Sequence, residues 1–129
     1  FGVAGSDINF NSSQADHNVE DGFYVGRQTS AQATDCKANN NGGSGFRANA
    51  FTLIRFVGAS QTTSNYVGAL VQHHSTFVFT GSLALTNNSK YGLMVSMMSY
   101  TENDQINTMT GNGNNNVPYV HVGSNRFNF

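Results

Sequence analysis

Aromatic, guanidinium, imidazole and amide side chains gather in three short stretches of the chain, separated by similar lengths of sequence. Such a mixture suits saccharides, because rings pack against the C–H faces of a sugar and polar groups hydrogen-bond its hydroxyls. A guanidinium would also pair with the carboxylate of an acidic sugar. An ordinary solvated surface remains the alternative. The predicted carbohydrate-contacting residues are Tyr24, Arg27, Arg47, Asn49, Gln72, His73 and His74.

The carboxylates decide whether the chain can cleave a glycosidic bond. Hydrolysis generally needs two carboxyl groups about 5–9.5 Å apart. Glu102 and Asp104 alternate along a possible strand, which would place them on one face roughly 6–7 Å apart. A lyase would instead need a base beside a cation, and His73 near Arg47 fits that requirement. Glu102, Asp104 and His73 are therefore the candidate catalytic residues, although charged residues near turns are usually only solvated.

Two further expectations concern the same face. Adjacent residues of a strand point to opposite faces, so at most one of His73 and His74 is expected to face a given groove, and a hydrogen-bonded core histidine is the alternative for the one that points inward. The end of the face then turns apolar, which predicts a subunit interface. Packing of its methionines beneath the C-terminal segment is the alternative. The apolar residues are Leu70, Met94, Met97 and Met98.

Composition narrows the possible partners. Only 10% of the residues are charged and the formal net charge is -1, whereas nucleic-acid and anionic-membrane binding usually need a dense basic surface. No apolar run is long enough to cross a membrane. Neither the acidic residues nor the histidines have a recognised metal-ligand spacing, so neither a metal nor another cofactor is expected. Cys36, the single cysteine, is expected to pack in the core.

The elements that must position these residues recur along the chain. Segments opening with glycine and an apolar residue start at Gly22, Gly45, Gly68 and Gly92, spaced 23, 23 and 24 residues apart. An earlier copy begins at Gly2. Apolar residues alternate within each copy, which is the signature of strands, and Asn- and Gly-rich turns separate the strands. The glycines are expected to let the chain bend at a corner, with Thr/Ser and Asn columns forming ladders at others.

A repeat with several short strands cannot bury its apolar face alone, so copies must stack. The sequence therefore predicts an all-β solenoid, a right-handed parallel β-helix of about five coils of 20–25 residues. Residues 1–100 are assigned to the coils, as the end of a longer solenoid, and residues 101–129 to an irregular C-terminal capping segment. A two-sheet sandwich is the alternative, but it does not predict columns at one long period.

Coils of this length, with Asn-rich turns and a Gly-apolar-x-Val strand start, resemble the pectate-lyase-like right-handed β-helix superfamily. Within it, the low charge and the C-terminal cap look most like bacteriophage tailspikes. The resemblance implies a homotrimer, located on a virion or otherwise extracellular, that binds bacterial surface polysaccharide. The alternative is a polysaccharide-degrading lyase, glycoside hydrolase or epimerase. An ice-binding solenoid would need a flat Thr array, and only one Thr/Ser column is present. No functional residue carries over from the superfamily, because no family catalytic motif is present.

Overall fold

The computed structural model describes residues 2–4, 6–103, 108–113, 119–120 and 125–126, which form strands arranged in three parallel sheets. Sheet A contains β1 (Gly2–Ala4), β4 (Phe23–Gly26), β7 (Ser44–Asn49), β10 (Val67–Gln72), β13 (Tyr91–Val95) and β16 (Tyr119–Val120). Sheet B contains β2 (Asp7–Asn11), β5 (Ser30–Thr34), β8 (Leu53–Val57), β11 (Thr76–Phe79), β14 (Tyr100–Asn103) and β17 (Asn125–Arg126). Sheet C contains β3 (Gln14–Asp16), β6 (Lys37–Asn39), β9 (Ala59–Thr63), β12 (Ser82–Thr86) and β15 (Met109–Thr110).

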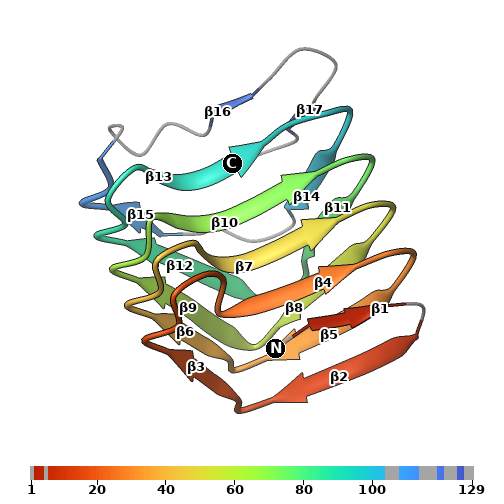
Figure 1. Ribbon diagram of the computed structural model, residues 1–129, viewed down its shortest axis with the longest axis horizontal. Helices are drawn as coiled ribbons and strands as arrows, with labels where there is room; N and C mark the ends of the chain where they lie inside the picture. The colour runs from red at the N-terminus through yellow and green to blue at the C-terminus, as the bar shows by residue number, and fades with distance from the viewer. Residues whose placement is uncertain (1, 5, 104–107, 114–118, 121–124, 127–129) are drawn as a thin grey trace.

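Successive turns of the chain add a strand to each sheet, and the strand pairs are parallel. In Figure 1 the turns stack from the N-terminal to the C-terminal end, so the prediction of an all-β parallel solenoid is confirmed. The solenoid has about four turns, slightly fewer than the five expected. Gly2 pairs with Tyr24 rather than with the expected Gly22.

The core is a set of side-chain columns that run along the solenoid. Phe23, Phe46, Ala69 and Leu93 occupy one column, in the register that the repeat predicts. The rings of Phe23 and Phe46 stack with centroids 4.9 Å apart and planes inclined by 8°. Cys36 is fully buried, as predicted, and this burial raises the pKa of its thiol. Apolar residues of all three sheets thus share one continuous interior.

The glycine column has a different cause from the one expected. Gly45 and Gly68 are buried inside strands, and neither is among the residues with positive φ. A Cβ at Gly45 would lie 2.7 Å from the carbonyl oxygen of Gly68 and 2.8 Å from Cγ2 of Thr62. These positions therefore need glycine because neighbouring turns approach too closely for a side chain, and not because the chain bends there.

An asparagine ladder runs along the corner between sheets C and A. From Asn41 onward, each Oδ1 accepts hydrogen bonds from the backbone N–H and the Nδ2 of the asparagine one turn earlier. Four members are buried, and the ladder confirms the expected role of the Asn-rich turns. Its members are Asn18, Asn41, Asn65, Asn88 and Asn112.

The corner between sheets A and B repeats an unusual backbone conformation. At four successive turns of the described chain, two consecutive residues have φ between 54° and 61°, the left-handed region that side chains rarely adopt. The expected Thr/Ser column follows them, and it joins hydroxyls to backbone: the N–H of Thr52 donates to Oγ of Ser75 at 3.1 Å. We call the residues of these pairs, which are exposed except for the half-buried Ala50, the corner ridge. Its members are Arg27, Gln28, Ala50, Phe51, His73, His74, Met97 and Met98.

Strands continue beyond residue 100. β14 pairs with β11 and β17 pairs with β14, so polar residues enter columns that are apolar in earlier turns. Thr101 follows Phe77, and Asn103 follows Phe79, in agreement with the sequence pattern. The assignment of residues 101–129 as a cap stays a prediction. The structure contains no membrane-length apolar helix in the described part of the chain.

Candidate functional site

Five of the seven predicted carbohydrate-contacting residues meet in one polar network at the outer face of sheet A. Nδ2 of Asn49 donates to the Tyr24 hydroxyl at 3.1 Å, and Oδ1 of Asn49 accepts from Nε2 of Gln72 at 3.3 Å. The same Oδ1 lies 2.6 Å from Nδ1 of His73. The guanidinium of Arg47 lies over the Tyr24 ring, 5.5 Å from its centroid. The register of β4, β7 and β10 brings these residues of three turns together.

Asp21 completes this network, and sequence reasoning missed its role. Its Oδ2 pairs with Nη1 of Arg47 at 3.1 Å, while its Oδ1 accepts the backbone N–H of Ser44 at 2.7 Å. The Arg47 side chain is 31% exposed and that of Asp21 is 10% exposed, so the ion pair is only partly desolvated. The repeat could have revealed this contact. Asp21 lies just before Gly22, and Arg47 lies just after Gly45, the equivalent glycine one turn later. The charge of Arg47 is consequently balanced by Asp21 within the protein.

The two histidines correct an expectation. His73 and His74 are both exposed, because they occupy a left-handed corner after β10 and are not part of a strand. Alternation between faces therefore does not apply to them. The His74 ring stacks on Phe51 of the previous turn, with centroids 4.9 Å apart and planes inclined by 10°. Phe51 remains 62% exposed, so the corner ridge presents an aromatic surface to solvent.

The two ends of the corner ridge differ in chemistry. Arg27 and Gln28 are exposed at the N-terminal end. Met97 and Met98 are exposed at the C-terminal end, and Tyr100 next to them is also exposed. The exposed methionines agree with the apolar stripe predicted from the sequence, and in the structure they stand at the corner instead of on the strand.

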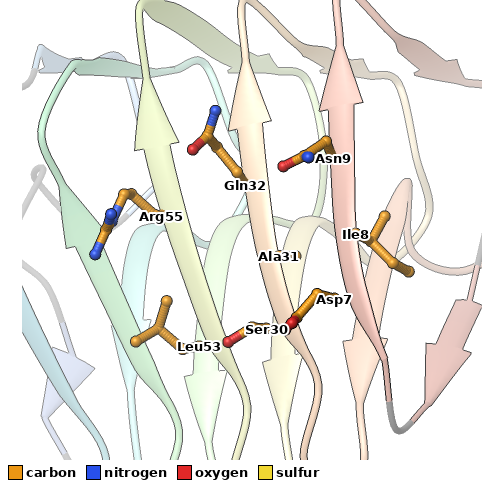
Figure 2. Close-up of a pocket in the computed structure, with 8 residues that line it drawn as sticks. All are labelled: Asp7, Ile8, Asn9, Ser30, Ala31, Gln32, Leu53 and Arg55. Atoms are coloured by element: carbon orange, nitrogen blue, oxygen red, sulfur yellow. The ribbon is translucent and has the colours of Figure 1, made fainter.

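Sheet B carries a depression that sequence reasoning did not find. It has a volume of about 280 Å³ and spans β2, β5 and β8 (Figure 2). Two outward rows of side chains flank it, and two residues between the rows form its base. The sequence repeat could have predicted the two rows, because neighbouring residues within each row are 23 positions apart in the chain. The lining residues are Asp7, Ile8, Asn9, Ser30, Ala31, Gln32, Leu53 and Arg55.

The candidate catalytic residues are not brought together by the described structure. Glu102 is exposed on β14 and pairs with Val78, in the outward row that also contains Arg55. Asp104 lies outside the described residues. His73 is hydrogen-bonded to Asn49. A catalytic role for Glu102, Asp104 or His73 therefore stays a prediction without a supporting contact.

Comparison of the chain with family models, curated proteins and solved structures finds no match. The functional argument accordingly rests on the three surfaces just described, the network on sheet A, the corner ridge and the depression on sheet B.

Proposed function

We propose that the chain is a binding module for bacterial surface polysaccharide and works within a homotrimeric virion tailspike or a related extracellular appendage. One observation carries the proposal: the exposed Phe51–His74 stack stands beside the hydrogen-bonded side chains of Asn49, Gln72 and His73. An aromatic platform next to ordered amide groups is the chemistry that a sugar ring with hydroxyl substituents requires.

The network lowers the cost of binding. Rotatable side chains lose entropy when a ligand orders them, at about 0.5–1.5 kcal/mol for each. Asn49, Gln72 and His73 already hold one another, so part of this cost is met in the free protein. Asn49 and Gln72 are half-buried and His73 is exposed, and their groups retain further hydrogen-bonding capacity for a ligand.

The apolar end of the corner ridge supports the assembly part of the proposal. Met97, Met98 and Tyr100 form an exposed group at the C-terminal turns, and exposed apolar patches commonly mark contact surfaces. Light scattering of the purified chain tests this part. A trimer that dissociates in a Met97→Ser/Met98→Ser variant is the expected result, and a stable monomer at all accessible concentrations would contradict it.

Calorimetric titration with a panel of bacterial capsular and lipopolysaccharide glycans tests the binding part. Replacing Phe51 by Ala removes the aromatic ring. The variant should keep the left-handed backbone conformation at this position, because Ala50 already has the same φ of 59°. Loss of one aromatic contact of about 1.4 kcal/mol lowers affinity roughly tenfold. The matched control is Tyr66→Ala, since Tyr66 is 49% exposed but lies outside the ridge.

Three outcomes decide the proposal. A loss of affinity in Phe51→Ala with unchanged binding in Tyr66→Ala supports it. Absence of binding across the panel, or equal losses in both variants, contradicts it. Shortening of the polysaccharide, or new absorbance from unsaturated sugars, would instead support the alternative of a degrading enzyme.

A further inference from the structure

We propose that the depression on sheet B is a second binding site, which takes an acidic sugar unit with its carboxylate against Arg55. The proposal rests on the proposed function in that its ligand is a unit of the same class of polysaccharide. It adds the chemical class of that unit and a surface separate from the sheet A network.

The shape of the depression follows from the strand register. Asp7, Ser30 and Leu53 stand in one outward row, and Asn9, Gln32 and Arg55 in the next. Ile8 and Ala31 lie between the rows and line the base, with their side chains packed in the core. Ser30 leaves a hollow in the first row, because it is much smaller than Leu53 on one side and Asp7 on the other.

The dimensions suit a single sugar unit. Rows two residues apart along a strand are separated by about 6.6 Å, and three turns span about 10 Å along the solenoid. The volume of about 280 Å³ is just below the usual range of about 300–1,000 Å³ for small-molecule sites. A polysaccharide that runs along the solenoid axis would lie between the two rows and place one unit over Ser30.

Three polar side chains of this site have no partner among the described residues, whereas Nε2 of Gln32 donates to Oγ1 of Thr34 at 3.3 Å. In the part of the chain that the structure describes, no hydrogen bond or ion pair engages the side chains of Arg55, Asp7 or Asn9. All three are exposed, and all three line the depression. Arg47 on sheet A differs, because Asp21 already neutralises its guanidinium. Of Arg47 and Arg55, it is therefore Arg55 whose guanidinium is available to bind an anion.

The charges define both the class of the ligand and its orientation. Arg55 and Asp7 lie in different rows and two turns apart, at opposite corners of the depression (Figure 2). A carboxylate bound at Arg55 gains a charge-assisted, bidentate pair. Asp7 would repel a second anion and instead accepts hydrogen bonds from hydroxyls, while the Asn9 and Gln32 amides donate or accept along the row. A hexuronic acid unit, with one carboxylate and several hydroxyls, satisfies this arrangement.

The test compares a hyaluronan octasaccharide, which contains glucuronic acid, with the same octasaccharide after reduction of its carboxylates. Calorimetric titration of the 129-residue chain is expected to show at least tenfold tighter binding of the acidic form. Arg55→Gln should remove this preference and leave the affinity for the reduced form unchanged. Ser30→Tyr, which fills the hollow without changing a charge, should lower affinity for the acidic form as well.

The control for general electrostatic attraction is Lys37→Gln, because Lys37 is an exposed cation on sheet C. Retained preference for the acidic form in Arg55→Gln would overturn the inference, and so would an equal loss in Lys37→Gln. Equal competition by sodium sulfate would reduce the site to a general anion site and also overturn it. These results differ from failure of the proposed function, which is measured separately by the effect of Phe51→Ala on the reduced octasaccharide and on the glycan panel.

Discussion

The asparagine ladder allows the effect of one substitution on stability to be worked out from individual hydrogen bonds. The Asn65 side chain is 1% exposed, and its Oδ1 accepts from N and Nδ2 of Asn41 at 2.9 and 2.8 Å. Its Nδ2 donates to the carbonyl oxygen of Ala38 at 2.8 Å and to Oδ1 of Asn88 at 3.2 Å. Asn65→Ala removes all four of these bonds.

Each such bond contributes about 1 kcal/mol net, and polar groups left buried without partners add to the loss. Asn65→Ala is therefore expected to lower the free energy of unfolding by about 4 kcal/mol. Domains of this size are stable by only about 5–15 kcal/mol, so the variant should retain a small margin of stability. The backbone N–H of Asn65, which donates to Asn88 at 3.1 Å, keeps its partner in the variant.

Urea unfolding followed by far-ultraviolet circular dichroism measures this loss, which is convenient because the chain has no tryptophan. The matched control is Asn11→Ala, since Asn11 is exposed at the end of β2 and should change stability by less than about 0.5 kcal/mol. A loss below about 1 kcal/mol in Asn65→Ala would refute the reasoning, because the ladder would then contribute no more than one solvated asparagine.

Three further outcomes are expected. Burial raises the pKa of the Cys36 thiol, so alkylation of Cys36 in the native protein should be slow. The buried neutral thiol also makes the free energy of unfolding fall as pH rises above the ordinary thiol pKa, because the unfolded chain then loses the thiol proton first. Urea unfolding at several pH values, compared with Cys36→Ala, checks this. Arg47→Gln should cost only about 0.5 kcal/mol in urea unfolding, because its ion pair with Asp21 is partly solvated. Phe46→Ala should cost about 3–5 kcal/mol in the same assay, since it empties the column above Phe23.

The fold was accessible from sequence because the interior repeats. One interior column contains three residue types, at Phe23, Phe46, Ala69 and Leu93. Their spacing alone predicts that they share a column, and the strand register confirms it. Spacing did not reveal why Gly45 is a glycine. That cause is the carbonyl oxygen of the next turn, which becomes visible only when the turns are placed against each other.

The spacing of residues in the sequence could not predict the corner ridge. Turns with positive φ are usually recognised by Gly or Asn, whereas this corner carries Phe51, His73 and Met97 in the left-handed region. With no local signal, the two histidines were treated as strand residues, so at most one of them was expected to face a given groove. The stacked turns impose the corner conformation, because backbone N–H groups there donate to carbonyls one turn later, as Phe51 does to His73 at 3.0 Å.

The ridge and the depression are linked through the chain itself. Phe51 precedes Leu53 by two residues, and Leu53 ends the first row of the depression. Thr52 between them is buried and holds the corner through its hydrogen bonds to Ser75 and Asn49. Two residues of backbone therefore separate the aromatic platform from the nearest lining residue of the depression on sheet B. A single glycan that contacts both would gain affinity from an effectively intramolecular second contact, without any movement of the protein.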